Sequence, residues 1–293
     1  MRRQDIYDLV LLAAAWGGSF LFIRMAVHEL GPLPLMGIRT LLAGLLLLPL
    51  LIWQKKLPLL LSFWKRIAVV GLFNSAFPFV LFAYATKTIP SGTMSVINAV
   101  TPLWGALIAW LWLKDRLPPL RILGLFVGLA GIVILVWDKL AAFNSESVLA
   151  VIAGVSAPIF YGVAASYTKK YLMKADPIAT SCGSLISAGL AILPFAWWNW
   201  PTTPVSFMSW GAALMLTVVC TSIAYLLYYK LLINVGPAKS LTVTFLVPVF
   251  GVFWGWLFLS EEINRYVLIG GAVILLGTAL ATGILGGKRK AYK

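Results

Sequence analysis

The sequence predicts an all-α integral membrane protein with ten transmembrane helices, arranged as two inverted five-helix repeats with both termini in the cytoplasm. Three observations carry this prediction. The chain is 61% hydrophobic and only 11% charged over 293 residues, more apolar surface than a soluble domain of this length can bury. Long apolar stretches recur along it, and its two halves resemble each other.

The apolar stretches are each about 20 residues or longer, enough to cross a hydrocarbon core of roughly 30 Å. Lipid offers no hydrogen-bond partners, so their backbone must be helical. A β-barrel would alternate polar and apolar residues in segments of about ten, and the run 45–52 does not alternate. In chain order the predicted spans are 6–28, 33–53, 64–86, 91–113, 119–138, 147–170, 177–198, 206–231, 236–259 and 264–286.

The internal repeat is visible in residues that match at a nearly constant offset. In one block the matching residues are 145 positions apart: Trp16 with Tyr161, Gly17 with Gly162, Pro32 with Pro177, Gly44 with Gly189 and Pro49 with Pro194. In another block they are 146 positions apart: Pro102 with Pro248, Gly105 with Gly251, Trp110 with Trp256, Gly124 with Gly270 and Gly131 with Gly277. We therefore expect one repeat over 1–140 and a second over 141–293. Five spans per copy is an odd number, so the copies enter the membrane from opposite sides, as in many secondary transporters.

The positive charge is distributed as membrane topology requires. With the N-terminus inside, 18 Lys and Arg fall on the inner side and 3 on the outer side, which places both termini in the cytoplasm. The net charge of +14 is therefore a topology signal, and we expect a lipid bilayer and a small-molecule substrate as partners, with no nucleic acid.

Enzyme and metal signatures are missing from the sequence. It has one histidine and no HExxH or cysteine-histidine metal spacing, and its nine carboxylates lie at span ends or in loops. We expect no catalytic residues, no metal and no cofactor, and no proton relay through an acid in the middle of the membrane.

The fourth predicted span carries polar residues and a proline on one face, spaced by four, three and four positions. We predict substrate contacts from Asn98, Thr101 and Thr244, the last being the repeat mate of Asn98. Pro102 and Pro248 are predicted hinges, because a proline within a span removes a backbone hydrogen bond and permits a bend. The alternative for all five is packing and hydrogen bonding between helices.

Aromatic side chains and one arginine complete the predicted site. Rings could hold an apolar or aromatic side chain of the substrate, although many aromatics of membrane proteins lie in interfacial belts. Arg39 lies about 9 Å inside its span at 1.5 Å per residue, where it could pair with a substrate carboxylate or support the wall of a cleft. The aromatic candidates are Trp16, Phe20, Phe79, Tyr84, Tyr161 and Tyr225.

These motifs resemble the drug/metabolite transporter superfamily, and within it the EamA family. The resemblance covers nearly the whole chain and is carried by Trp16-Gly17 with Arg24, by the stretch 39–44, by Pro102 with Gly105, and by their counterparts in the second half. The second copy keeps the acidic pair Glu261-Glu262 that the family often carries, whereas the first has Lys114-Asp115-Arg116.

The resemblance implies a monomeric exporter of the bacterial inner membrane that moves amino acids, above all aromatic ones, by alternating access. Two alternatives remain open. One is a broader drug or metabolite exporter, and the other is a membrane-embedded enzyme that acts on a lipid-linked substrate.

The predicted topology can be tested with cysteines at the two ends, introduced as Arg2→Cys and Tyr292→Cys. Both thiols are expected to resist a membrane-impermeant reagent in intact cells and to react after permeabilisation, because both termini are predicted to be cytoplasmic. Labelling of either thiol from outside would contradict the inverted-repeat prediction.

Overall fold

A computed structural model describes residues 2–137 and 145–283, which form helices and connecting turns without a strand. Eight helical segments in this part of the chain are long and apolar enough to cross a membrane, and two shorter apolar helices, Pro119–Leu135 and Val243–Leu259, occupy two further predicted spans. The all-helical prediction is confirmed, whereas the number of crossings and the side of the termini stay predictions. The predicted boundary at 140/141, residue 138 and residues 284–286 of the last span lie outside the described residues.

The helices follow the predicted stretches closely. The first half contains α1 (Arg3–Leu30), α2 (Pro32–Trp53), α3 (Leu57–Gly71), η1 (Leu72–Ala76), α4 (Phe77–Thr86), α5 (Ser91–Asn98), α6 (Thr101–Leu113) and α7 (Pro119–Leu135). The second half contains α9 (Ser145–Tyr171), α10 (Pro177–Trp198), α11 (Phe207–Thr217), η2 (Val218–Ile223), α12 (Ala224–Val235), α13 (Pro237–Ser240), α14 (Val243–Leu259) and α15 (Arg265–Thr282).

Local sequence explains where several helices begin. Proline is the first residue of α2, α7 and α10, where its missing N–H costs no hydrogen bond. Asp176 also caps α10 by accepting hydrogen bonds from the backbone nitrogens of Ile178 and Ala179, at 2.9 and 3.0 Å. Gly31 has a φ of 77°, and this left-handed conformation lets the chain turn directly from α1 into α2.

Equivalent helices of the two halves pack against each other through reciprocal contacts. A Cβ on Gly44 of α2 would lie 2.9 Å from the backbone nitrogen of Ile186 on α10, and one on Gly189 of α10 would lie 2.7 Å from Leu41 on α2. Gly44 matches Gly189 and Leu41 matches Ile186, so each contact is the repeat image of the other. Such reciprocity is the mark of a two-fold relation between the two copies.

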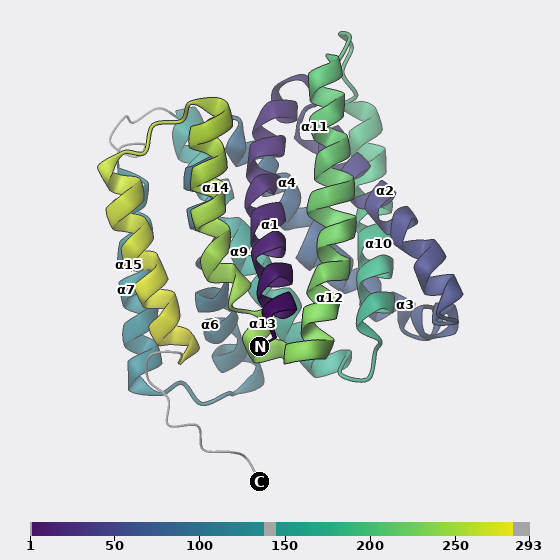
Figure 1. Cartoon of the computed structure of the whole chain (residues 1–293), viewed down its shortest axis with the longest axis horizontal. Coiled ribbons are helices and arrows are strands. Elements are labelled where there is room, and N and C mark those ends of the chain that lie inside the picture. The colour runs from purple at the N-terminus through teal and green to yellow at the C-terminus, as the bar shows by residue number, and fades with distance from the viewer. Residues whose placement is uncertain (1, 138–144, 284–293) are drawn as a thin grey trace.

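The same reciprocity joins α7 to α15, which lie side by side at one edge of the molecule (Figure 1). A Cβ on Gly124 would lie 2.5 Å from the backbone nitrogen of Ala281, and one on its mate Gly270 would lie 2.8 Å from Leu135. Small residues let the two backbones approach closely, which is how helices associate in lipid.

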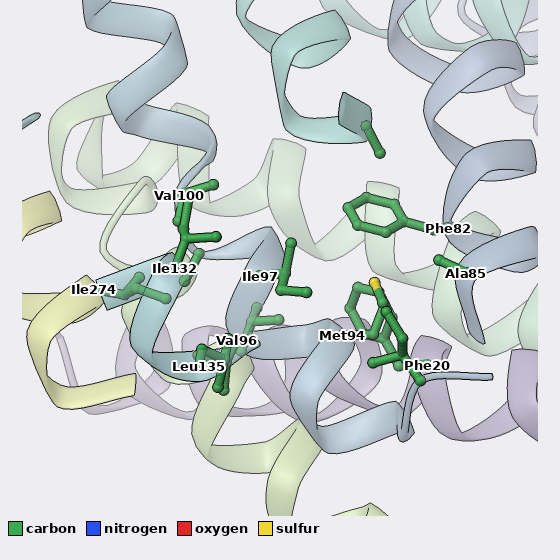
Figure 2. Packing of buried hydrophobic residues seen from close by; sticks show 14 of the residues in the cluster. Phe20, Phe82, Ala85, Met94, Val96, Ile97, Val100, Ile132, Leu135 and Ile274 are labelled. Atoms are coloured by element: carbon green, nitrogen blue, oxygen red, sulfur yellow. The ribbon is translucent and has the colours of Figure 1, made fainter. Parts of the chain in front are cut away.

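Helix α1 occupies the middle of the bundle, between α14 and the α11–α12 segment (Figure 1). It contributes to both large apolar clusters, one around α5, α7 and α9 and the other around α2 and α10. In the first cluster Phe20 meets Phe82 edge to face at 5.5 Å between ring centroids, close to Met94 and Ile97 (Figure 2). Residues on α1 and its repeat mate α9 are therefore the best placed to face the centre.

The close backbone contact between α7 and α15 predicts that Gly277→Ala destabilises the protein. A Cβ there would lie 2.4 Å from the backbone nitrogen of Gly128, and a backbone atom cannot move away as a flexible side chain can. We expect a loss of about 1–3 kcal/mol, measured as a lower apparent melting temperature in detergent. The matched control is Gly211→Ala, where the new methyl meets nothing within 4 Å, so the melting temperature should hold or rise. Equal effects of both substitutions would contradict the packing.

Candidate functional site

Two π-helical segments lie at matched positions in the two halves. Segment η1 starts at Leu72 and η2 at Val218, 146 residues later, the offset of the surrounding repeat. In η2 the wider turn is also seen in side-chain bonds, because Thr221 donates to the carbonyl of Leu216 and Ser222 to that of Thr217, each five residues back. A π turn inside an α-helix frequently marks a functional site, and its presence in both copies directs attention to the residues beside it.

Arg39 of α2 contacts η2 and reaches the start of α4, just beyond η1, and it is buried, with 6% of its surface exposed. Its Nε donates a hydrogen bond of 3.0 Å to Thr221 Oγ1 on η2. The guanidinium carbon lies 3.9 Å from the ring centroid of Phe79, the third residue of α4 and just beyond η1, in a cation–π contact. Within the described residues no carboxylate pairs with this guanidinium.

Tyrosines from two further elements complete the surroundings of Arg39. Tyr161 on α9 and Tyr225 on α12 lie near the guanidinium and pack against the apolar cluster that contains Phe79 and Cys220. The Tyr161 ring lies 6.2 Å from that of Phe82, which joins this site to the aromatic pair of Figure 2. We call Arg39, Phe79, Tyr161, Thr221 and Tyr225 the central site. It brings together side chains from both repeats.

Two buried hydroxyls beside the central site lack a hydrogen-bond partner. Ser75 on η1 approaches the hydroxyl of Tyr225 without reaching hydrogen-bond geometry. Ser19 on α1 likewise approaches the Cys220 thiol without forming a hydrogen bond. Because an unpaired buried hydroxyl costs free energy, both groups are available for a polar atom that enters from outside the protein.

The predicted site residues divide into those near Arg39 and those elsewhere. Phe79, Tyr161 and Tyr225 meet at the central site, and Phe20 reaches it through Phe82. Trp16 packs against Tyr228 with ring centroids 5.4 Å apart.

The other polar and aromatic candidates make local contacts. Thr101 Oγ1 donates to the carbonyl of Asn98 at 2.7 Å and approaches its Oδ1 at 3.4 Å, and Thr244 donates to the carbonyl of Leu241 at 2.8 Å. The Tyr84 side chain is exposed. Within the described residues none of these four candidates makes a hydrogen bond or a ring contact with the central site.

The two predicted hinge prolines lie in different surroundings. The fourth span is interrupted at residues 99–100, and Pro102 is in the first turn of the following helix α6. Pro248 lies inside the continuous helix α14, and the interruption of this span comes earlier, at residues 241–242. The repeats are thus matched in sequence at these prolines and different in backbone conformation.

Sequence reasoning passed over Ser75, Thr221 and Ser19. A usable signal was present, because Ser75 and Thr221 are hydroxyl residues 146 positions apart, each within an apolar span. Repeat-matched polar residues in apolar spans could have been collected in the same way as the glycines and prolines.

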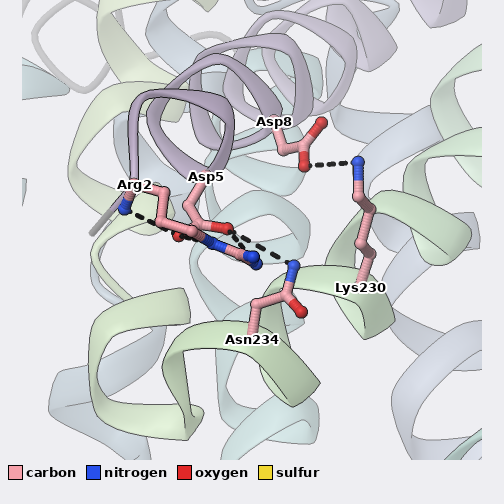
Figure 3. Close-up of polar contacts among 5 residues, drawn as sticks. All are labelled: Arg2, Asp5, Asp8, Lys230 and Asn234. Carbon is pink, nitrogen blue, oxygen red and sulfur yellow. Dashed lines mark hydrogen bonds and ion pairs between the residues drawn. The ribbon is translucent and has the colours of Figure 1, made fainter.

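One end of the bundle is held by charges that connect α1 to α12 (Figure 3). Asp8 Oδ2 lies 2.8 Å from Lys230 Nζ, an ion pair whose angle is poor for a hydrogen bond. Asp5 accepts a hydrogen bond of 3.3 Å from the Asn234 amide and pairs with Arg2. Both aspartates are buried, at 2% and 7% exposure, so these acids at the end of a span are part of the packed structure.

The opposite end is held by carboxylates at helix N-termini. Glu261 accepts from the backbone nitrogens of Ser91 and Gly92, at 2.7 and 2.9 Å, and from the Ser91 hydroxyl. Glu29 accepts from the nitrogen and hydroxyl of Ser206, the residue that caps α11. A negative charge is favoured at a helix N-terminus, where backbone N–H groups lack partners. Polar contacts therefore join elements that are far apart in the chain at both ends of the bundle.

Comparisons with known proteins agree on one family. The model of the EamA-like transporter family matches residues 6–137 and again residues 148–283. An uncharacterized transporter of Archaeoglobus fulgidus is 27% identical over 282 residues, which cover 94% of this chain and 96% of the relative. The uncharacterized inner membrane transporter YedA of Escherichia coli is 27% identical over 281 residues, 94% of this chain and 89% of the relative. A crystal structure covering 98% of this chain, with a TM-score of 0.67 and 18% identity, shares the fold.

The Asp8–Lys230 pair predicts that Lys230→Met lowers stability. The Asp8 side chain is only 9% exposed, so removing its cation leaves a poorly solvated carboxylate unpaired. The lysine side chain is 44% exposed, which reduces the expected loss to about 1–2 kcal/mol. The measurement is thermal unfolding in detergent.

A matched control is Lys169→Met, which breaks the Lys169–Asp115 pair, whose side chains are 57% and 45% exposed; we expect almost no change there. Adding Asp8→Asn to Lys230→Met should recover part of the loss, because no charge then stays unpaired. Equal losses for the two lysine variants would contradict the role of burial.

Proposed function

Because the chain belongs to the EamA-like transporter family, a family of small-molecule membrane transporters, we propose that it exports amino acids and related small metabolites by alternating access. Its relatives are named as transporters and share most of its length. We further propose that it acts as a monomer in a bacterial inner membrane, with its repeats inverted across the membrane plane and divided at residues 1–140 and 141–293.

The observation that carries this proposal is the central site, where residues of both repeats meet beside the two matched π-helical segments. In inverted-repeat transporters the substrate binds near the middle of the membrane, at the interface of the repeats, where regular helices are interrupted. Phe79, Tyr161 and Tyr225 supply aromatic surface there, and Arg39 supplies a charge.

The remaining predicted residues would contact the substrate on its way to or from this site. Trp16 and Phe20 lie on the central helix α1, next to the aromatic cluster. Asn98, Thr101 and Thr244 lie beside the interruptions of the fourth and ninth spans, and Tyr84 lies on an exposed face. All of these roles are proposals.

Alternating access requires each end of the bundle to open in turn. The Asp8–Lys230 contact and the Glu261 contact with α5 close opposite ends of the molecule, and separating either would open one path. The interruption beside Pro102 separates α5, which Glu261 contacts, from α6 in the same span. A bend at this interruption would therefore move α5 away from the bundle. Pro248 would have the matching role in α14 by allowing a straight helix to bend.

Counterflow in proteoliposomes tests the proposal. Vesicles loaded with an unlabelled amino acid should accumulate its labelled form from outside, and protein-free vesicles should not. We expect Tyr161→Ala to lower the initial exchange rate roughly tenfold through lost aromatic contact. The control is Trp198→Ala, since Trp198 is 90% exposed and should leave the rate unchanged.

The pattern of substrates separates this proposal from its alternatives. Exchange of unrelated drugs as fast as amino acids would favour a broad exporter. Exchange of no amino acid in a panel covering all side-chain classes would contradict the proposed function. Chemical conversion of a lipid-linked compound by the purified protein would point to an enzyme.

A further inference from the structure

We propose that Arg39 makes the central site a receptor for one carboxylate, and that the protein recognises its substrate by this acid group without a protein carboxylate for an ammonium group. The inference rests on the proposed function and sharpens it, because it places 2-amino acids and the corresponding acids without an amino group in one substrate class. It depends on what surrounds the Arg39 guanidinium.

The Arg39 guanidinium lacks a counter-charge. The Arg39 residue is only 6% exposed, so its guanidinium loses most of its hydration, and such a charge in a membrane protein normally pairs with an anion. Here its direct contacts are the Thr221 hydroxyl and the face of Phe79, and Tyr161 and Tyr225 lie nearby. These contacts hold the side chain in place and leave its positive charge without an anion among the described residues.

In the part of the protein that the structure describes, the two Nη atoms of Arg39 are free to bind a ligand. Nε is occupied by Thr221, and no hydrogen bond is made by either Nη within the described part of the chain. Arginine binds carboxylates through two parallel N–H donors. The unpaired hydroxyls of Ser19 and Ser75 lie beside the same group of residues, and hydroxyls can donate to the second lone pairs of a carboxylate oxygen.

The charge of Arg39 sets the charge of the ligand. Arg39 is the single cation among the residues of the central site, so one bound negative charge would neutralise it. A phosphate with two charges would leave an excess buried charge, which is costly in an apolar surrounding. A monocarboxylate is therefore the anion that fits.

Among the described residues the central site contains no carboxylate that could pair with an ammonium group of the substrate. The carboxylates whose partners are described lie away from the central site. They are Asp5, Asp8, Glu29 and Glu261 at the two ends of the bundle, and Asp115 and Asp176 in ion pairs with Lys169 and Lys56. The Phe79 ring is already covered by Arg39. An amino group would thus contribute little to binding, and its removal from the substrate should be tolerated.

A ligand series on the purified protein tests the inference directly. The probes are phenylalanine, 3-phenylpropionate, phenylalanine amide and phenethylamine, which share one ring and differ in the acid and amino groups. A ligand that binds only the folded state raises the melting temperature, and the rise grows with the ligand concentration relative to its Kd. We expect both acids to stabilise the protein at similar concentrations, and the amide and the amine to need at least tenfold more, because charge-assisted bonds to Arg39 are lost.

Variants assign this preference to Arg39. With Arg39→Gln the acids should lose their advantage over the amide, and with Arg39→Lys part of it should return, since the charge stays and the two-donor geometry is lost. The matched control is Arg24→Gln, which removes an equal charge from the same bundle. Arg24 donates to the carbonyls of Thr86 and Lys87 at the end of α4, so the acid preference should persist there. If Arg39→Gln fails to fold, Thr221→Val offers a milder change that releases Nε and should weaken both acids together.

The outcomes separate this inference from the proposed function. If phenethylamine or the amide stabilises the wild-type protein as well as the acids do, or if the acid preference survives in Arg39→Gln, the inference is wrong even where amino acids are exchanged across vesicles. If the acids bind through Arg39 and no amino acid exchanges in counterflow, the carboxylate site stands and the proposed transport function is wrong. Stabilisation by phenylalanine but not by 3-phenylpropionate would show that the ammonium group is recognised, and would overturn the proposal.

Discussion

The fold depends on close backbone contact between matched helices of the two halves. In lipid there is little hydrophobic gain from pressing apolar helices together, so association relies on packing and on groups small enough to let backbones approach. Gly17 of α1 faces Gly251 of α14, and its mate Gly162 of α9 faces Gly105 of α6. Together with the α2–α10 and α7–α15 contacts, these pairs join each half to the other. The interface between repeats is therefore the main packing interface of the protein, and α1 and α9 run through its middle.

That arrangement explains how polar groups can exist at the centre. Helices joined by these glycine contacts bring residues of η1, η2 and α2 together between the repeats. Arg39 is held there by Thr221, 182 residues away in sequence, and by Phe79. Most other charges with known contacts lie at the ends, where Glu261 and Asp8 join elements that are far apart in the chain.

Much of this fold can be predicted from sequence, because a span of about 20 apolar residues is a strong local signal. The predicted span 177–198 coincides with α10, and the span 33–53 differs from α2 by one residue. The interruption at 99–100 and the π-helical turns were not predicted, since they depend on how neighbouring helices pack. Of the residues around the proposed site, Arg39 could be predicted from its charge within a span, Phe79 and Tyr225 from aromaticity, and Tyr161 from aromaticity and repeat position. The unpaired hydroxyl of Ser19 could not be predicted, because a serine in an apolar span usually forms a hydrogen bond with its own helix.

The differences between the repeats bear on how the two ends open. Glu261 holds the start of α5 through the backbone nitrogen of Ser91. The repeat mate of Ser91 is Pro237, which has no N–H to donate, and the mate of Glu261 is Asp115, which pairs with Lys169 instead. One end is thus held by a carboxylate on backbone N–H groups, and the corresponding contact at the other end is an exposed ion pair, which contributes less. The buried Asp8–Lys230 pair adds a second contact at that end. The two states of a carrier built from similar repeats need not be equal in free energy, and here the unequal end contacts supply the physical source of that inequality.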